Sequence, residues 1–234
     1  SDHPRTWRRN STRQRDLGRL SDKRGAALRV MKCTKCGVEA VISLPQHRLK
    51  LCAEHLPEWV AEMTQRAIVK YDMFRPDERI LLAVSGGKDS LSLWDVLIGL
   101  GYQTEGVYIH LGIEHEAYSD VSEDKVRAFA ASREQARFRV VNIRDTYGKT
   151  ITELARTRRG QRTCSVCGLI KRHVMNRIAR EGGYAAIATG HNLDDEAATL
   201  FQNTLRWQMG YLQRQAPALP AVEGGLARKV KPFC

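Results

Sequence analysis

One short stretch constrains the fold of this chain more than any other, because it joins an apolar run to two adjacent glycines and then to a helical pattern. Residues 80–84 are apolar and are followed directly by Ser85, Gly86, Gly87, Lys88, Asp89 and Ser90. Leu91, Trp94 and Leu97 then recur at helical spacing. Adjacent glycines let the backbone approach an anion, and a helix N-terminus offers that anion N–H donors and a favourable dipole. The stretch predicts a buried strand, a phosphate-binding turn and a helix.

The amino-acid sequence of this turn excludes the two most familiar phosphate-binding loops. A Walker A loop requires a glycine five positions before its Gly-Lys pair and a Ser or Thr after the lysine. Leu82 and Asp89 occupy these places here. The GxGxxG of a dinucleotide-binding fold is absent from the sequence as well.

The charge of the chain indicates a polyanionic partner such as nucleic acid. Its 234 residues carry a formal net charge of +12. Residues 1–30 hold nine Lys and Arg against three Asp, a net charge of +6, with almost no periodic apolar residues. We expect this segment to be disordered, and to be either an RNA-binding arm or an extension without a function of its own before a start at Met31.

The use of cysteine and the lack of membrane signals suggest a reducing compartment. No apolar run is long enough to span a membrane, and the N-terminus lacks the apolar core of a signal peptide. We therefore expect a cytoplasmic protein with no membrane partner. The six cysteines are then better interpreted as metal or redox ligands than as a disulfide framework.

Two pairs of candidate metal ligands lie near the start of the chain. Cys33 and Cys36 form a CxxC, and after fifteen intervening residues Cys52 and His55 form a CxxH. Two such pairs close a tetrahedral zinc site of three sulfurs and one nitrogen. We predict a zinc-binding knuckle over residues 31–56 with a small hairpin around residues 38–44, and a structural role for the metal. Free thiols that happen to have this spacing are the alternative.

Helical and strand patterns alternate through the rest of the chain. A linker helix is expected within residues 57–76, before a domain over residues 77–234. Further strands are expected over residues 106–111, 138–143 and 184–189, and helices over residues 123–136 and 150–159. This alternation predicts an α/β fold with a doubly wound parallel sheet, whose ligands bind beyond the carboxyl ends of the strands. Ser85, Ile109 and His110 fall at such ends, although the role of His110 stays open.

A second CxxC opens a helix with a strongly basic surface. Cys164 and Cys167 precede the cations Lys171, Arg172, His173, Arg177 and Arg180. Three interpretations compete: a redox pair whose thiols are activated by the helix N-terminus, half of a second zinc site, or ligands of an iron–sulfur cluster completed by a distant cysteine.

Carboxylates cluster after the last expected strand. Gly190 leads into a predicted helix whose start carries Asp194, Asp195 and Glu196. Helix capping alone would explain acidic residues here. Their place beside a strand end and its glycine favours Mg²⁺ carrying ATP phosphates. Beyond Trp207 the sequence is loop-like.

Taken together and in this order, the motifs make residues 31–233 resemble the TtcA/TtuA family of tRNA 2-thiouridine synthetases, and most closely its TtuA branch, within the PP-loop ATP pyrophosphatases. The matching parts are the CxxC/CxxH knuckle, SGGKDS at residues 85–90, TCSVCGLIKR at residues 163–172, TGHNLDDEA at residues 189–197 and KVKPF at residues 229–233. The resemblance implies an adenine nucleotide alpha hydrolase-like PP-loop domain with a small N-terminal zinc finger.

The resemblance also assigns roles to residues. It implies that zinc is held by Cys33, Cys36, Cys52 and His55. It implies that ATP is held by Ala83, Ser85, Gly86, Gly87, Lys88, Asp89, Ser90, Ile109, Lys171 and Gly190. Lys171 and Asp195 would serve phosphate or Mg²⁺ and catalysis. Cys164 and Cys167 would take part in catalysis as two ligands of a 4Fe-4S cluster.

The activity implied is ATP-dependent 2-thiolation of a tRNA uridine, with AMP and pyrophosphate as products. In the TtuA branch the substrate is the T-loop 5-methyluridine 54, and sulfur arrives as the thiocarboxylate of a ubiquitin-like carrier protein. A homodimer is compatible with the resemblance. The family's third cluster cysteine lies beyond the KPF segment, so a chain truncated at its C-terminus is expected, and Cys234 is not expected to replace that ligand.

Three alternatives remain open from the sequence. The enzyme could thiolate another tRNA position. It could be a different PP-loop ligase that adenylates its substrate and uses ammonia. It could also be a zinc-knuckle RNA-binding module whose ATP site is idle.

Overall fold

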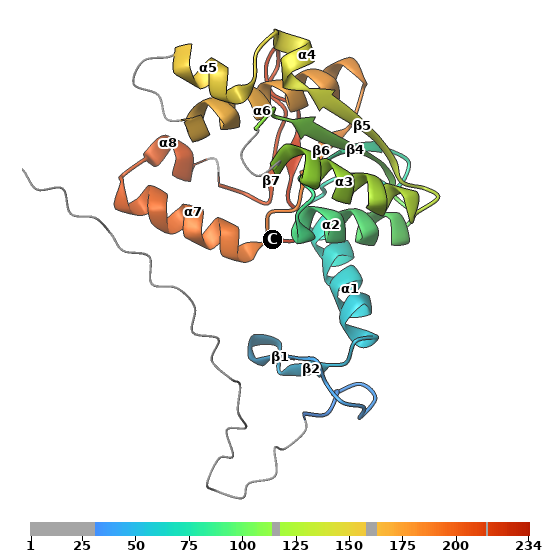
Figure 1. Ribbon diagram of the computed structural model, residues 1–234. Coiled ribbons are helices and arrows are strands. Elements are labelled where there is room, and N and C mark those ends of the chain that lie inside the picture. The colour runs from blue at the N-terminus through green and yellow to red at the C-terminus, as the bar shows by residue number, and fades with distance from the viewer. Residues whose placement is uncertain (1–30, 114–117, 158–162, 214) are drawn as a thin grey trace, which may run out of the picture. The chain divides into compact units, whose positions relative to one another are not determined.

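The computed structural model describes residues 31–113, 118–157, 163–213 and 215–234 (Figure 1). The expectations for residues 1–30 lie outside this described part. The described residues divide into two compact units, the first ending at Cys52 and the second beginning at Ala53. No helix among the described residues is both long and apolar enough to cross a lipid bilayer.

The first unit is built on a two-stranded hairpin. Strands β1 (Ile42–Leu44) and β2 (Leu49–Leu51) pair antiparallel, with Ile42 opposite Leu51. A 3-10 turn, η1 (Pro45–His47), connects them, and Arg48 closes it with a left-handed φ of 52°. The hairpin therefore starts and ends later than the expected region around residues 38–44.

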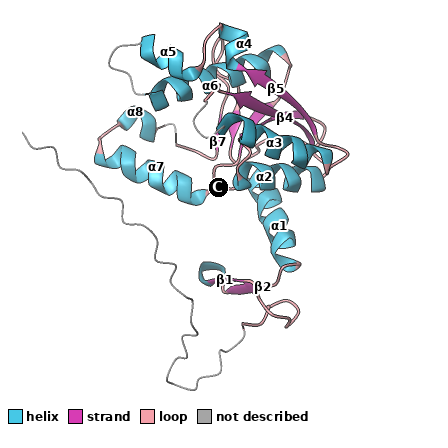
Figure 2. Ribbon diagram, in the orientation of Figure 1, coloured by secondary structure: helices cyan, strands magenta, loops and turns pink. Residues whose placement is uncertain are grey.

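A six-stranded sheet forms the centre of the second unit (Figure 2). Its order is β5-β4-β3-β6-β8-β7, and only the edge strand β7 runs antiparallel to its neighbour. The strands are β3 (Arg79–Ala83), β4 (Gln103–His110), β5 (Arg137–Asn142), β6 (Ala186–Thr189), β7 (Ala218–Leu219) and β8 (Lys229–Val230). The chain moves outward from β3 to β5 and then returns to place β6 on the other side of β3. This reversal confirms the doubly wound α/β fold.

Helices cover both faces of this sheet (Figure 1). The helices of the second unit are α1 (His55–Lys70), α2 (Lys88–Gly99), α3 (Tyr118–Ala131), α4 (Ile143–Tyr147), α5 (Ile151–Thr157), α6 (Thr163–Glu181), α7 (Leu193–Leu205) and α8 (Met209–Leu212). One core joins α1, α2 and α3 to the face of Leu82 and Ala188, and the other joins α4, α5 and α6 to the face of Leu81 and Ile187. Alternate residues of each strand thus enter opposite cores.

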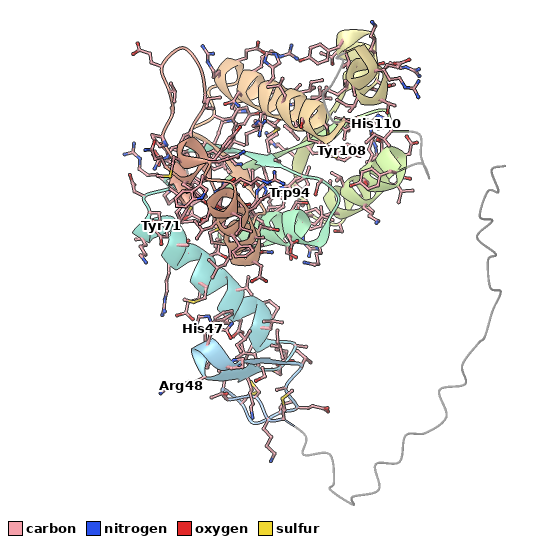
Figure 3. The ribbon with its side chains drawn as sticks, turned by 90° about the vertical axis from the view of Figure 1, so that its left-hand side faces the viewer. His47, Arg48, Tyr71, Trp94, Tyr108 and His110 are labelled. Atoms are coloured by element: carbon pink, nitrogen blue, oxygen red, sulfur yellow. The ribbon has the colours of Figure 1, made fainter. Side chains whose placement is uncertain are left out.

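Trp94 shows how tightly α2 is packed against the sheet (Figure 3). Its ring is fully buried, and its indole N–H donates to Thr104 Oγ1 at 3.1 Å. A Cβ on Gly106 of β4 would lie 2.7 Å from the Trp94 ring. Any larger residue at this position would therefore clash with the indole. This packing holds the N-terminal end of α2 at the end of β3.

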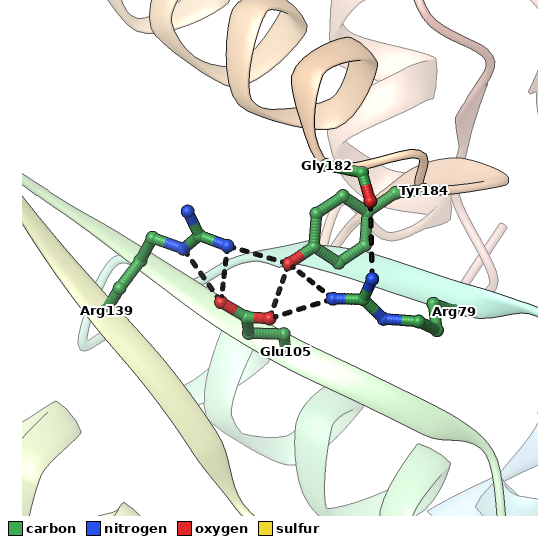
Figure 4. Close-up of polar contacts among 5 residues, drawn as sticks. All are labelled: Arg79, Glu105, Arg139, Gly182 and Tyr184. Atoms are coloured by element: carbon green, nitrogen blue, oxygen red, sulfur yellow. Dashed lines mark hydrogen bonds and ion pairs between the residues drawn. The ribbon is translucent and has the colours of Figure 1, made fainter.

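Polar contacts tie the amino ends of three strands together (Figure 4). Glu105 accepts hydrogen bonds from Arg139 Nε at 2.7 Å and from the Tyr184 hydroxyl, and it pairs with Arg79 at 3.4 Å. Both guanidinium groups also donate to the Tyr184 oxygen. Residues from β3, β4, β5 and the approach to β6 are therefore fixed at the end of the sheet opposite the glycine turn.

Several expected elements differ from the structure. The helix expected over residues 123–136 is α3, which already begins at Tyr118 and ends at Ala131. The loop-like region beyond Trp207 contains α8, β7 and β8. The two strands of this region are only two residues long each, too short for a periodic pattern. Helix α4 was not expected.

Candidate functional site

The glycine turn is shaped by sterics at Gly86. This residue has a left-handed φ of +75°, and a Cβ there would lie 2.5 Å from the carbonyl oxygen of Ser122 in α3. Only glycine satisfies both the conformation and the close approach. Gly87 is the N-cap of α2, and no side chain caps this helix. Its first-turn N–H groups are therefore available to an anion.

Serine hydroxyls hold the turn in this shape. The Ser85 N–H donates to Ser90 Oγ at 3.1 Å, and Ser90 Oγ donates to the Gly87 carbonyl at 3.0 Å. The Gly87 N–H donates to Ser85 Oγ at 3.3 Å. These hydrogen bonds lie within the loop itself, which preorganises it for binding an anion.

Gly190 brings the second glycine segment against this turn. Strand β6 is hydrogen-bonded to β3, so the two strands end side by side. A Cβ on Gly190 would lie 2.8 Å from the backbone carbon of Asp89 and from the backbone nitrogen of Ser90. The two loops meet at the point where the strand order reverses, which is the ligand-binding position of doubly wound sheets.

Four of the residues expected to bind ATP line one cavity of about 120 Å³ at this end of the sheet. They are Ala83, Ser85, Ile109 and Lys171. The remaining lining residues are Val84, Val107, Tyr108, Leu111, Tyr118 and Met175. Strands β3 and β4 thus share the cavity with α3 and α6. Sequence reasoning missed the two tyrosines and Met175, because their patterns are those of ordinary strand and helix residues.

Two ring side chains, Tyr108 and His110, lie two positions apart at the end of β4 (Figure 3). Burial raises the pKa of Tyr108 to about 12, and its hydroxyl donates to the Ser119 carbonyl at 2.7 Å. His110 accepts at Nδ1 from the Gly112 N–H at 3.3 Å, and its Nε2 lies 3.0 Å from Asp120 Oδ1. Both rings therefore anchor the start of α3 beside the cavity.

Lys88 and Asp89 do not line this cavity. The Lys88 side chain is 85% exposed, and its ammonium lies 2.7 Å from Asp89 Oδ1. The Asp89 carboxylate raises the pKa of Lys88. The lysine is thus charged and free of packing constraints.

The three carboxylates at the start of α7 have different surroundings. Asn192 and Asp195 form a capping box. Asn192 Oδ1 accepts hydrogen bonds from the backbone N–H groups of Asp194 and Asp195. In return, Asp195 Oδ2 accepts a hydrogen bond from the Asn192 N–H at 3.1 Å. Glu196 is instead paired with Lys231 at 2.5 Å. Capping is therefore part of the explanation for these acids, and Asp195 keeps its second carboxylate oxygen, Oδ1, for another partner.

The second CxxC lies in the first turns of α6. Cys164 is exposed, whereas Cys167 packs against the core beneath α6. Lys171 follows them by seven and four residues, so all three share one side of the helix. Within the described residues, no group of three metal-ligating side chains includes either thiol. Cys234 instead donates its S–H to the His191 carbonyl at 3.4 Å.

The predicted zinc ligands do come together. One ligand atom from each of Cys33, Cys36, Cys52 and His55 lies within 4.8 Å of the others. Burial acts to raise the pKa of the Cys33 thiol, but backbone hydrogen bonds from Cys36, Cys52 and Lys35 outweigh it and lower the pKa to about 6. Three sulfurs and one imidazole at this separation fit a tetrahedral Zn²⁺ ion.

Comparison with known protein families gives two matches. Residues 56–213 match the PP-loop domain. Residues 32–57 match the N-terminal LIM domain of 2-thiouridine synthetase TtuA.

Named relatives are similar to most of this chain. The tRNA-5-methyluridine(54) 2-sulfurtransferase of Thermus thermophilus is 49% identical over 87% of this chain and 62% of its own length. The enzyme of the same name from Thermotoga maritima is 40% identical over 87% of this chain and 66% of its own length. The chain thus spans less than two thirds of these relatives.

A solved structure has a similar fold. The U34-tRNA thiolase NcsA from Methanococcus maripaludis, determined with its [4Fe-4S] cluster, superposes with a TM-score of 0.73 at 23% identity. The match covers 87% of this chain and 67% of that chain. The match supports the fold described above.

Proposed function

We propose, from the premise that this chain belongs to the PP-loop domain family, that it binds ATP where its two glycine segments meet and uses it to thiolate a tRNA uridine at carbon 2. One observation carries the ATP site: Ala83, Ser85, Ile109 and Lys171, from three separate parts of the sequence, line a single cavity beside an uncapped helix N-terminus. The names of the relatives supply the substrate class.

The chemistry explains why ATP is needed. The carbonyl oxygen at C2 of uridine is a very poor leaving group, so it must first attack the α-phosphate of ATP and become part of an adenylate. Pyrophosphate leaves in this step. When sulfur then attacks C2, the C–S bond forms, the C–O bond breaks, and AMP leaves with the former uridine oxygen.

The residues of the turn would stabilise the charge that develops on pyrophosphate. The N–H groups at the start of α2 and the helix dipole face the same position as the Gly86–Gly87 backbone. Lys88 is exposed and free to swing toward the phosphates. Lys171, inside the cavity, would hold the phosphate nearest the reacting oxygen.

We propose two metal sites, one for Mg²⁺ beside the bound ATP and one for Zn²⁺ in the N-terminal knuckle. Asp195 would use its free oxygen for Mg²⁺, which neutralises the phosphates of bound ATP. Zn²⁺ would be held by Cys33, Cys36, Cys52 and His55 and would stabilise the fold of the N-terminal knuckle.

Cys164 and Cys167 would hold a 4Fe-4S cluster, which supplies an iron site for sulfur. The described residues provide these two thiols on the side of α6 that carries Lys171, and no third ligand beside them. These two thiols supply only part of the ligand set of such a cluster.

The proposed substrate is tRNA, and the proposed target base is 5-methyluridine 54, because the similar relatives are named for this base. The basic residues of α6 and the net charge of +12 suit an RNA backbone. The proposal includes a ubiquitin-like protein thiocarboxylate as sulfur donor, a homodimer as the working state, and the cytoplasm, where thiols stay reduced.

Pyrophosphate release tests the proposal. The protein is incubated with ATP, Mg²⁺ and an unmodified tRNA transcript, and we expect release that requires tRNA. Lys88→Met should reduce the rate at least roughly tenfold, while Lys70→Met, which removes an exposed lysine on α1, should leave it unchanged. ATP binding without tRNA-dependent release would instead identify an RNA-binding module with an idle ATP site.

The position of the modified base is tested separately. Nucleoside mass spectrometry of tRNA treated with the protein, ATP and a sulfide donor should find sulfur at position 54. Transcripts with cytidine at position 54 should stay unmodified. Thiolation of that variant at another uridine would contradict the assignment.

A further inference from the structure

Strand β8 and the residue after it carry two lysines, Lys229 and Lys231, next to β6. Lys229 pairs with Ile187 of β6, and Val230 pairs with Ala188. Val230 is fully buried in the core beneath α2. Because side chains alternate along a strand, Lys229 lies on the opposite face, which α6 covers.

Lys231 has a clear structural role. Its ammonium lies 2.5 Å from Glu196 Oε2, and the two side chains are only 7% and 18% exposed. Its backbone N–H donates to the Pro217 carbonyl at 2.8 Å. This buried ion pair fixes the first turns of α7 to the end of β8.

Lys229 has no comparable partner. It is half-buried, and its ammonium makes no hydrogen bond or ion pair with any residue that the structure describes. Burial, followed by the neighbouring Lys231 and Arg172 charges, lowers the pKa of Lys229, while Glu196 acts in the opposite direction. A half-buried charge without a partner is costly, and an anion would remove that cost.

Arg172 lies on a turn of α6 that hydrogen bonds tie to the segment before Lys229. Asn176 Oδ1 accepts from the Ala227 N–H at 2.7 Å, and Asn176 Nδ2 donates to the Arg172 carbonyl at 2.7 Å. One turn of α6 is thereby fixed to the segment that leads into β8. Lys171 enters the ATP cavity, and Arg172, one residue later, is turned by about 100° around the helix. It therefore projects from another side of α6.

We propose that Lys229 and Arg172 form a phosphate-binding subsite next to the ATP cavity, which takes a phosphodiester of the RNA backbone close to the target nucleotide. The inference rests on the proposed function. The charge of Arg172 acts on Lys229 from the turn of α6 that is tied to Ala227, and Glu196, the carboxylate that acts on Lys229, is already paired with Lys231. A phosphate group supplies the missing negative charge and hydrogen-bond acceptors.

Salt-dependent RNA binding tests the subsite. Lys229→Met keeps the length of the side chain and removes its charge. We expect the affinity for tRNA, measured by fluorescence anisotropy, to fall roughly tenfold, and the slope of log K against log salt to fall by about one. The affinity for ATP should not change. The matched control is Lys125→Met, an exposed lysine on α3 at the other face of the sheet, which should leave the affinity and slope as they are.

Lysine acetylation followed by mass spectrometry identifies the phosphate. Protection of Lys229 by tRNA alone supports an RNA phosphodiester. Protection by ATP or pyrophosphate without tRNA keeps the subsite but assigns it to the nucleotide, whether or not the protein acts on tRNA. Unchanged acetylation with every ligand, together with unchanged tRNA binding by Lys229→Met, overturns the subsite even where tRNA-dependent pyrophosphate release is observed.

The melting temperature shows that the variant is folded. Lys229→Met should melt no lower than the unmodified protein, because an unpartnered charge is replaced by an apolar side chain. A lower melting temperature would mean that the Lys229 ammonium has a partner within the protein, which also contradicts the subsite.

Discussion

At the scale of single residues, Gly190 is a position where a small increase in volume should have a large effect on nucleotide binding. A Cβ there meets the backbone of Asp89 and Ser90 at 2.8 Å. Backbone cannot move aside as a side chain can, so Gly190→Ala should displace the turn and lower the affinity for ATP roughly tenfold or more. Isothermal titration calorimetry measures this.

The control for that substitution is Gly99→Ala at the end of α2, where a Cβ meets no atom within 4 Å. It should bind ATP as the unmodified protein does. Equal affinities of the two variants would show that Gly190 does not shape the site.

Glu105 should make stability depend on pH. Burial acts to raise its pKa, but hydrogen bonds from Tyr184 and Arg139 outweigh this and leave the pKa below its ordinary value of 4.5. A carboxyl group whose pKa is lower in the folded than in the unfolded state stabilises the fold at every pH above its unfolded-state pKa. This stabilisation is lost as the pH falls through the folded-state pKa. Glu105→Gln should therefore melt lower than the unmodified protein at pH 7, and this difference should shrink between pH 5 and pH 3.

Glu223→Gln, in an exposed loop, serves as the matched control and should melt like the unmodified protein throughout. A melting difference for Glu105→Gln that stays constant down to pH 3 would contradict the role of the Glu105 charge.

At the scale of elements, the start of α7 is the most informative, because Asn192 sets where the helix begins and Asp195 completes the capping box. Asn192→Ala removes the acceptor for two N–H groups and should cost about 1 kcal/mol of unfolding free energy. Asn192→Gly should cost only a few tenths. Chemical denaturation compares the two. If Asn192→Ala is as stable as the unmodified protein, the side chain does not cap the helix.

The elements also show what could be read from the sequence. The stretch over residues 80–97 specified β3, the turn and α2 because each part has a strong local signal. Strand β8 has only two residues and gave none, so the positions of Lys229 and Lys231 beside α6 and α7 became visible only in the fold. Residue pairs such as Glu196 and Lys231, 35 positions apart, leave no pattern in a single sequence.

At the scale of the whole molecule, the two units should respond differently to metal removal. In the described part of the first unit the buried apolar side chains are few: Cys33, Ala40, Leu51 and Cys52. Such a small core requires the metal to stay folded. A chelator should abolish amide protection over residues 31–52 while the melting transition of residues 53–234 remains. Persistent protection in metal-free protein would contradict a structural zinc site.

The order of the motifs along the chain predicted the architecture better than any single residue predicted its role. The alternation of strand and helix patterns was sufficient to predict the α/β fold, whereas the meeting of the two glycine segments became visible only in the structure. The roles of Lys171, Asp195 and the second CxxC depend on substrates, and these stay predictions.

The central claim is that ATP activates the C2 oxygen of a tRNA uridine, and oxygen tracing tests it most directly. tRNA containing ¹⁸O at uridine C2 is incubated with the protein, ATP, Mg²⁺ and a sulfide donor, and the nucleotide products are analysed by mass spectrometry. The account predicts AMP that carries the ¹⁸O atom, in the same amount as 2-thiouridine. Unlabelled AMP, or label in inorganic phosphate, would contradict it.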